Sequence, residues 1–230
     1  MSDATDDLKR AAADGAVDQL PDGIIVGLGS GSTAAFAVSS LGRRVREGFR
    51  VIGIPTSEKT ASQARELGIA LATLGEYPEV DVTIDGADEV ELGTLNLIKG
   101  GGGNLLREKI VAAASKQFVI IVDHSKLVQK LGSRSPLPVE VSQFGWQSTA
   151  QRLAASGAKP VRRTTAEGGA YVTDGGNYIL DCRFGAIGSA MDLRFRLDST
   201  VGVIEHGLFV GMASRVFVAS PDGVQVLKRA

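Results

Sequence analysis

Short, strongly apolar runs recur along the first half of this chain, with helix-like segments between them. The strand-like runs lie at residues 24–28, 50–54, 70–74, 80–85 and 118–122. The helix-like segments lie at residues 8–19, 33–41, 58–67 and 105–116. Strands that are apolar throughout are typical of sheets buried on both faces. Their alternation with helices predicts an α/β fold whose largely parallel sheet is covered by helices on both sides.

The pattern changes near Gly132, where Pro136 and Pro138 interrupt the chain. We expect a strand, a helix, three strands and a helix at residues 138–141, 147–155, 159–163, 170–173, 178–182 and 189–198. The intervening Asp-Gly-Gly-Asn at 174–177 indicates a hairpin turn. This order predicts a small α+β domain inserted late in the main one. The expected domains are residues 132–204 for the small one, and residues 1–131 with 205–230 for the main one.

The charge of the chain is nearly balanced, with 25 Lys and Arg against 26 Asp and Glu. A balanced chain has no electrostatic reason to bind nucleic acid or an anionic membrane, so neither is an expected partner. No apolar run approaches the roughly 18 residues of a membrane helix, and residues 1–7 lack the features of a signal peptide. The single cysteine, Cys182, excludes an internal disulfide. We therefore expect a cytoplasmic protein in which Cys182 is a small buried residue.

The first candidate site is the segment 27–33, Gly-Leu-Gly-Ser-Gly-Ser-Thr, between a predicted strand and a predicted helix. Backbone N–H groups at a helix start favour an anion, glycine allows close approach, and Ser30, Ser32 and Thr33 add hydroxyl donors. The segment predicts a phosphate site, with a tight serine-capped turn as the simpler alternative. An NAD-dependent oxidoreductase is disfavoured, because Ser32 occupies the third glycine position of the dinucleotide motif.

The second candidate site, Asp85-Gly86-Ala87-Asp88-Glu89, follows a predicted buried strand. Ligands of open parallel sheets bind beyond the carboxyl ends of the strands, so these carboxylates are expected beside a substrate. An exposed acidic turn and a divalent-metal site are the alternatives. No histidine or further compact acidic group completes a metal site in the sequence. Direct acid–base work is therefore the favoured interpretation, and no metal is expected.

The third candidate site is Lys99 with the four glycines after it, ahead of a helix that Asn104 is placed to cap. Consecutive glycine N–H groups form a second anion-binding nest. In the helix, charged residues 107–109 point three ways among apolar residues, so we expect the helix to be buried on most sides. At least one of these charges then needs a partner or a site. Surface ion pairing accounts for Arg107 and Lys109, which leaves Glu108.

Lys126 and two histidines carry weaker signals. Lys126 lies just beyond the carboxyl end of a predicted strand, where it is either a ligand for an anion or an ordinary surface lysine. His124 and His206 are the only histidines, and the spacing gives neither a serine or cysteine partner. We expect structural roles for both histidines.

Five blocks of this sequence, in their order and spacing, resemble the type A ribose-5-phosphate isomerases. The blocks are residues 26–34 (VGLGSGSTA), 85–89 (DGADE), 99–109 (KGGGGNLLREK), 123–126 (DHSK) and 136–141 (PLPVEV). The resemblance extends from about Leu8 to the C-terminus. It departs mildly at Asn104, where alanine or cysteine is frequent, and between residues 183 and 198. The resemblance implies a Rossmann-like three-layer α/β/α domain and a small ferredoxin-like domain, in a homodimer or possibly a homotetramer.

The resemblance also implies interconversion of ribose 5-phosphate and ribulose 5-phosphate through an enediolate, in the non-oxidative pentose phosphate pathway, with no metal or cofactor. By position, Glu108 is the general base, Asp85 and Asp88 handle hydroxyl protons and ring opening, and Lys99 stands beside the enediolate. The substrate-binding residues implied are Ser30, Gly31, Ser32, Thr33, Asp85, Gly86, Ala87, Asp88, Lys99, Gly100, Gly101, Gly102 and Lys126.

The chemistry of isomerisation agrees with these roles. A proton leaves a carbon next to a carbonyl, so negative charge grows on oxygen, and a carboxylate base with a fixed cation meets both needs. Two other functions stay open at this point. A non-catalytic sugar-phosphate sensor explains the glycine loop but gives no reason for the four charged residues to coexist. A related enzyme, such as a deaminating isomerase or a CoA transferase, would use a similar site on another substrate.

Overall fold

The computed structural model describes residues 2–229, so Met1 and Ala230, the outer ends of the predicted main domain, lie outside the described residues. The chain divides into two compact units. The first unit comprises the residues up to Ala87, Arg107–Lys126 and the residues from Met212 onward, and the second comprises Asp88–Leu106 and Leu127–Gly211. Residues 88–106, which we expected in the main domain, belong to the second unit. The domain assignment itself stays a prediction.

A seven-stranded sheet, formed within residues 2–229, is the centre of the first unit. Its strands are β1 (Ile24–Leu28), β2 (Val51–Pro55), β3 (Ala70–Leu71), β4 (Val80–Asp85), β7 (Ser115–Asp123), β14 (Arg215–Ser220) and β15 (Gly223–Lys228). They lie in the order β15-β14-β7-β4-β1-β2-β3, all parallel except β15 at one edge. Without β15, this order is the 3-2-1-4-5-6 arrangement of a Rossmann fold.

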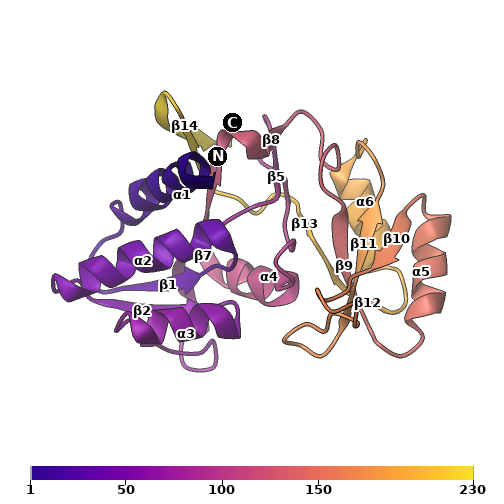
Figure 1. Ribbon diagram of the computed structural model, residues 1–230, viewed down its shortest axis with the longest axis horizontal. Helices are drawn as coiled ribbons and strands as arrows, with labels where there is room; N and C mark the ends of the chain where they lie inside the picture. Colours follow the sequence, from indigo (N-terminus) through magenta and orange to yellow (C-terminus); the bar gives the residue numbers. More distant parts are fainter. Residues whose placement is uncertain (1, 230) are drawn as a thin grey trace. The chain divides into compact units, whose positions relative to one another are not determined.

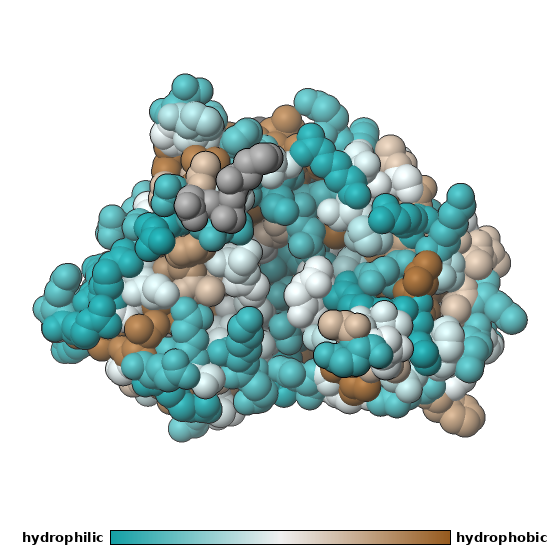
Figure 2. Space-filling view, in the orientation of Figure 1, coloured by the Kyte–Doolittle hydropathy of each residue, from teal (hydrophilic) through white to brown (hydrophobic). Residues whose placement is uncertain are grey.

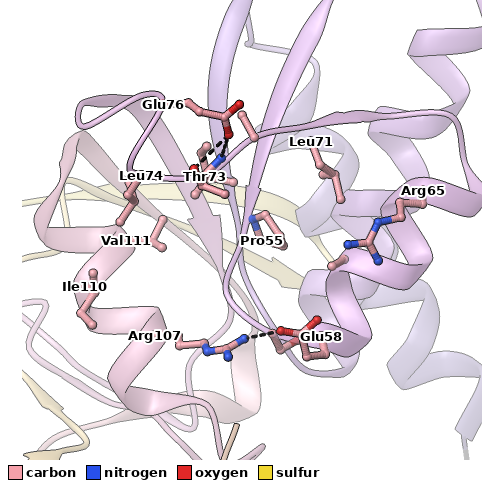
Figure 3. A pocket seen from close by; sticks show the side chains of 14 residues that line it. Pro55, Glu58, Arg65, Leu71, Thr73, Leu74, Glu76, Arg107, Ile110 and Val111 are labelled. Atoms are coloured by element: carbon pink, nitrogen blue, oxygen red, sulfur yellow. Dashed lines mark hydrogen bonds and ion pairs between the residues drawn. The ribbon is translucent and has the colours of Figure 1, made fainter. Parts of the chain in front are cut away.

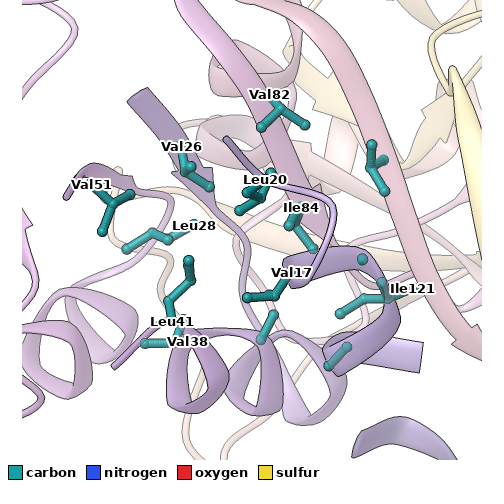
Figure 4. Close-up of a cluster of buried hydrophobic side chains, with 14 of the residues drawn as sticks. Val17, Leu20, Val26, Leu28, Val38, Leu41, Val51, Val82, Ile84 and Ile121 are labelled. Atoms are coloured by element: carbon teal, nitrogen blue, oxygen red, sulfur yellow. The ribbon is translucent and has the colours of Figure 1, made fainter. Parts of the chain in front are cut away.

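Helices cover both faces of this sheet. The helices are α1 (Ser2–Val17), α2 (Ser32–Arg46), α3 (Glu58–Glu66) and α4 (Leu105–Ala113), drawn in Figure 1. Apolar residues of α1 and α2 pack on those of β1, β4 and β7 in a large buried cluster (Figure 4). A smaller cluster contains Ile54, Val80 and Val111, which come from β2, β4 and α4. The predicted three-layer arrangement is confirmed, with a much smaller apolar cluster beneath α4 than beneath α1 and α2.

Most predicted elements form close to their expected bounds, and β4 has the bounds that were predicted. Helix α4 ends at Ala113, before the predicted end at Lys116, because Ser115 already pairs with Val80 as the first residue of β7. Strand β15 was not predicted. Its residues are mostly exposed at a sheet edge, so it lacks the continuous apolar run by which the buried strands were found.

The second unit contains an antiparallel sheet with two helices. In chain order the described elements are β9 (Leu137–Val141), α5 (Trp146–Ala155), β10 (Lys159–Arg162), β11 (Tyr178–Arg183), α6 (Ala190–Asp198) and β12 (Val203–His206). The strand order is β10-β11-β9-β12, which with this βαββαβ succession is the ferredoxin-like arrangement. The core includes Val139, Leu153, Leu180 and Leu193. The small α+β fold that the sequence predicted is therefore present.

The predicted strand at 170–173 does not form, although its hairpin turn does. A backbone hydrogen bond of 2.9 Å from Thr173 to Asn177 closes the turn, and an isolated bridge joins Val172 to Tyr178. Beyond this bridge both edges of β11 are occupied, one by β9 and the other by β10. The chain before the turn pairs instead with the segment after β10, through a bridge between Ala170 and Thr164, so the prediction of a longer hairpin was wrong.

A second small sheet in the second unit contains β5 (Glu89–Glu91), β6 (Leu97–Ile98), β8 (Leu127–Val128) and β13 (Leu208–Phe209). Within residues 207–220, β13 pairs with β6 in this second sheet, and only β14 joins the first sheet. Figure 2 shows a largely hydrophilic face with apolar side chains in small separate groups. Across residues 2–229, the structure contains no helix long and apolar enough to cross a membrane.

Candidate active site

The first candidate segment starts where β1 ends, next to the carboxyl end of β4. Between these neighbouring strands the strand order of a Rossmann-like sheet changes direction, and ligands bind in the crevice beyond that point. The Gly29 N–H donates to the Ile84 carbonyl at 3.0 Å, which ties the two strand ends together. Ser30 and Asp85 therefore lie at the edge of the sheet where a substrate is expected.

Asp85 is fully buried at the end of β4. Its Oδ1 accepts the backbone N–H groups of Ser30 at 3.1 Å and Gly86 at 2.8 Å. A Cβ atom on Gly29 would lie 2.2 Å from this same oxygen, far inside contact distance. Gly29 is therefore required by the close approach of the aspartate, in addition to any ligand.

Glu108 lies in the first turn of α4 and is only 3% exposed. The Ser30 hydroxyl donates to its Oε1 at 3.0 Å. The same hydroxyl lies 2.8 Å from Thr56 Oγ1, and Thr56 in turn donates to the Leu28 carbonyl at 3.0 Å. Ser30 thus links the buried carboxylate of α4 to the ends of β1 and β2.

The sequence analysis missed Thr56. The available signal was its place directly after Pro55, at the carboxyl end of β2. This is the same edge of the parallel sheet at which Ser30 follows β1. A hydroxyl at such a position deserved the same weight as the serines of the glycine loop.

The start of α2 has the properties of an anion site. Gly31 precedes the helix with φ of +94°, a left-handed value that glycine adopts without strain. Within the described chain no side chain caps this helix, and its first turn contains no acidic residue. Ser32 is exposed and Thr33 is half-buried. The backbone N–H groups and the helix dipole of such a start attract a phosphate.

Lys126 lies at the same edge of the first sheet. It belongs to the 3₁₀ turn η1 (His124–Lys126), which follows the carboxyl end of β7, the strand beside β4. The Asp123 carboxylate accepts from the Ser125 backbone N–H at 2.9 Å and from its hydroxyl, which fixes this turn. Lys126 is half-buried and brings a cation to this turn.

In the second unit, the glycine turn after Lys99 is held against Asp88. The Gly101 N–H donates to Asp88 Oδ2 at 2.8 Å, and a Cβ on Gly101 would lie 2.6 Å from Oδ1. Arg163, a residue that the sequence analysis missed, donates to the Gly100 and Gly101 carbonyls at 3.0 Å each. Its guanidinium also pairs with Asp181 on β11. The turn is thereby fixed from the ferredoxin-like sheet, which no sequence spacing indicated.

Lys99 itself is nearly buried, with 2% exposure. Its ammonium nitrogen lies 5.5 Å from the centroid of the Phe209 ring, within the range of a cation–π contact. Its backbone N–H donates to the Gly207 carbonyl at 2.9 Å. Asn104, which we expected to cap α4, instead donates its side-chain amide to the Gly102 carbonyl at 3.4 Å. The second unit therefore contains a buried lysine whose backbone is held by a hydrogen bond.

Glu89 has a structural role. It is fully buried, and its carboxylate accepts the backbone N–H groups of Gly132, Arg134 and Ser135 at 2.6 to 2.8 Å. These donors occupy both of its oxygens, so Glu89 closes a loop of its own unit. The metal-site alternative for residues 85–89 loses one of its three carboxylates.

His206 is buried and engaged through both ring nitrogens. Nε2 lies 2.9 Å from Asp198 Oδ1, and Nδ1 accepts the Leu208 backbone N–H at 3.2 Å. With Glu205 these residues are the one group of potential metal ligands found among residues 2–229. Because Nδ1 already accepts a hydrogen bond, neutral His206 has its proton on Nε2, which is then no metal ligand. These contacts support the structural role that we expected.

A cavity of about 540 Å³ in the first unit lies between α3, α4 and the ends of β2 and β3 (Figure 3). Arg107 and Glu58 form an ion pair of 2.8 Å at this cavity, as Figure 3 shows. Ile110, another lining residue, is 48% exposed, whereas most other residues of α4 are buried or half-buried, as expected. None of the predicted site residues lines the cavity. Glu108 accepts a hydrogen bond from Ser30 and is not among the lining residues.

Known proteins resemble this chain over most or all of its length. The family model of ribose 5-phosphate isomerase A (phosphoriboisomerase A) matches residues 52–223. A ribose-5-phosphate isomerase A from Gloeobacter violaceus is 61% identical over 222 residues, which are 96% of each chain. The corresponding protein of Synechococcus sp. is 54% identical over 228 residues, which are 99% of each chain.

Solved structures share the fold. Ribose 5-phosphate isomerase A from Methanocaldococcus jannaschii gives a TM-score of 0.93 at 43% identity, over 97% of this chain and 99% of that one. A D-ribose-5-phosphate isomerase in complex with phospho-erythronic acid gives 0.95 at 36% identity, over 98% and 99%. With the fold and the sequence blocks in agreement, this chain belongs to the ribose-5-phosphate isomerase A family and is an isomerase of ribose 5-phosphate.

Proposed function

We propose that Glu108 is the general base in the conversion of ribose 5-phosphate to ribulose 5-phosphate. The observation that carries this proposal is its 3.0 Å contact with Ser30 at the carboxyl edge of the first sheet. Ligands of such sheets bind at this edge. A carboxylate that is 3% exposed is also shielded from bulk water, which favours its use as a base.

The proton transfer balances within the substrate and the glutamate. The Glu108 carboxylate takes the proton from C2 of the open-chain aldose, and the C–H electron pair forms the C1=C2 double bond. The C1 carbonyl becomes an enediolate oxygen. Return of the proton from Glu108 to C1, with transfer of the O2 proton to O1, gives the ketose. General-base catalysis is typically worth 10²- to 10⁴-fold, so electrostatic stabilisation has to supply much of the remaining acceleration.

Lys99, Asp85 and Asp88 are proposed to handle the oxygens of the substrate. The buried Lys99 ammonium would stabilise the enediolate charge, which a low-dielectric surrounding makes more effective. Asp85 and Asp88 would exchange protons with the sugar hydroxyls and open the ring. Both aspartates are held by backbone N–H groups, which fixes their carboxylates before any substrate binds.

The remaining predicted residues are proposed to bind the substrate. The start of α2, with Ser30, Gly31, Ser32 and Thr33, and the cation of Lys126 suit a phosphate and sugar hydroxyls. The backbone of Gly86, Ala87 and the glycine turn would line the sugar. The proposed groups are Ser30, Gly31, Ser32, Thr33, Asp85, Gly86, Ala87, Asp88, Lys99, Gly100, Gly101, Gly102 and Lys126.

Conversion of ribose 5-phosphate by the purified chain, with and without EDTA, tests this scheme. We expect turnover that chelation leaves unchanged, since the scheme uses no metal and no cofactor. Loss of turnover with EDTA, restored by a divalent cation, would move the carboxylates of residues 85–88 to a metal site. Glu108→Gln with full activity would remove the proposed base.

We also propose that the protein acts in the cytoplasm as a homodimer or homotetramer, in the non-oxidative branch of the pentose phosphate pathway. The lone cysteine, which is buried, supports a reducing compartment. The oligomeric state rests on the family resemblance. Light scattering coupled to size-exclusion chromatography measures it, and a monomer at assay concentration would contradict it.

A further inference from the structure

A relay of buried hydrogen-bonding groups, Glu108, Ser30, Thr56 and the Leu28 carbonyl, runs from α4 into the first sheet. Its contacts are Glu108 Oε1 to Ser30 Oγ at 3.0 Å, Ser30 Oγ to Thr56 Oγ1 at 2.8 Å, and Thr56 Oγ1 to the Leu28 carbonyl at 3.0 Å. Ser30 and Thr56 are 9% and 0% exposed. Either hydroxyl of the central contact is able to be the donor. Buried polar groups rely on hydrogen-bond partners within the protein, because bulk water does not reach them.

The ionised and protonated forms of Glu108 differ in how many hydrogen bonds the relay is able to form. Each hydroxyl has one proton to donate, and the Leu28 carbonyl only accepts. When Glu108 is ionised, Ser30 and Thr56 supply two protons for the three contacts, so one contact lacks a hydrogen bond. When Glu108 is protonated on Oε1, the oxygen that contacts Ser30, a third proton is present. Glu108 then donates to Ser30, Ser30 to Thr56, and Thr56 to Leu28, and every contact is a hydrogen bond.

We propose that Thr56 is a positioning residue that lets Glu108 gain and lose its proton without movement of heavy atoms. This inference rests on the proposed role of Glu108 as the base. With Thr56 donating to the Leu28 carbonyl in both states, rotation of the Ser30 hydroxyl proton converts the arrangement of the ionised state into that of the protonated state. Thr56 supplies the acceptor that the Ser30 proton needs once Glu108 is protonated, and it thereby strengthens Glu108 as a base.

Removal of the Thr56 hydroxyl has a defined consequence. In Thr56→Val, the ionised state keeps the bond from Ser30 to Glu108. In the protonated state the Ser30 proton faces an apolar group and is left without an acceptor, which is costly in a buried site. Glu108 therefore holds its proton less well, becomes a weaker base, and loses activity at a lower pH on the acid side.

The variant changes none of the charged groups around the relay. In the first unit these are Asp85 on β4, whose Oδ1 accepts from the Ser30 backbone, and Arg107 and Lys109 beside Glu108 on α4. Glu58 on α3 is held in the ion pair with Arg107. Because all of them are retained, a shift that appears with valine and disappears with serine comes from the hydroxyl.

The test compares the pH dependence of kcat for Thr56→Val, Thr56→Ser and Thr83→Val. Thr83 is the matched control, since it is also fully buried in the first unit and its hydroxyl bonds Ser115 at 2.6 Å, away from the relay. For Thr56→Val we expect the acid limb to move down by roughly 0.5–1 pH unit, the value of one net hydrogen bond. We expect kcat to fall by about two- to threefold, because the base is weaker, with little change in KM.

Thr56→Ser is expected to restore both the limb and kcat, and Thr83→Val to leave the limb in place. An unshifted limb in Thr56→Val overturns the relay, as does the same shift in Thr83→Val. If Thr56→Val does not fold, Thr56→Ala deletes the same hydroxyl and decides the question. Glu108→Gln is measured alongside. An active Glu108→Gln enzyme rejects the proposed base, whereas an inactive one with an unshifted Thr56→Val limb rejects the relay alone.

Discussion

Two buried glutamates, Glu108 in the first unit and Glu89 in the second, have similar exposures of 3% and 0% and very different partners. Glu89 accepts backbone N–H groups through both oxygens. These groups donate and never accept, so they offer a carboxylic acid proton no acceptor. Glu108 is bonded by the hydroxyl of Ser30, which is able to donate or to accept. Burial alone does not mark a base, and the nature of the partner separates the two roles.

Glu108→Gln tests the catalytic role of Glu108 and has the largest expected effect. Glutamine keeps the shape of the side chain and removes the basic oxygen, so we expect kcat to fall by about 10²- to 10⁴-fold. The far-UV circular dichroism spectrum and the melting temperature should stay close to those of the parent. Activity within twofold of the parent, from well-folded protein, is incompatible with Glu108 as the base.

Gly29→Ala tests the same site by displacing Asp85. The new Cβ would lie 2.2 Å from Asp85 Oδ1, so the aspartate has to shift. Displacement of a catalytic group by about 1 Å can cost about 10²-fold in rate, and we expect a loss of that order in kcat/KM. The matched control is Gly188→Ala, where no atom lies within 4 Å of the added Cβ. Equal losses in both variants would show that the close approach to Asp85 is unimportant.

Glu89→Gln tests the structural side of the comparison. The amide replaces one acceptor oxygen with an NH₂ group that faces backbone donors, so we expect about 1–3 kcal/mol of lost stability. The measurement is urea unfolding, with kcat determined per folded molecule. We expect that kcat to be unchanged. A large loss of kcat in a stable variant would give Glu89 a part in the chemistry.

Cys182 extends the comparison to a titratable group without such partners, and its effect is the smallest. Burial raises the pKa of its thiol from 9.0 to about 12. The folded chain keeps this proton up to about pH 12, whereas the unfolded chain loses it near pH 9.0. The contribution of the thiol to stability is therefore intact below pH 9.0 and is lost as the pH rises toward 12.

Reaction with a disulfide reagent at pH 8 checks this directly. The native protein should react very slowly, and the unfolded protein should release about one equivalent of reporter, since the sequence has one cysteine. Rapid reaction of the native thiol would contradict its burial. A control in urea separates local exposure from global unfolding.

The sequence was sufficient for the parts of the fold that burial dictates. The strands of the first sheet are buried from both sides, so each leaves an apolar run, and β4 was predicted with its observed bounds. Strand β15 and the failed strand at 170–173 depend on which sheet edges are free. Edge availability is a property of the assembled sheet, so local sequence does not report it.

The residues of the candidate site also fall into those that the sequence indicated and those that it did not. Glu108 and Lys99 stood out in the sequence because a charge in an apolar or glycine-rich setting needs a reason. Thr56, Arg163 and the structural role of Glu89 did not, because their partners come from distant parts of the chain. The sequence does not show whether a threonine after a strand, or a carboxylate in an acidic turn, belongs to the active site or stabilises a loop.

The most direct test of the central claim follows the hydrogen at C2 of the substrate. Ribose 5-phosphate labelled with deuterium at C2 is incubated with the parent and with Glu108→Gln, and loss of the label from C2 is measured by NMR. This counts proton abstraction whether the label passes to C1 or to water. The account predicts loss of label with the parent and at least about 10²-fold slower loss with Glu108→Gln. Loss at the parental rate in the folded variant would contradict it, because another group would then remove the C2 proton.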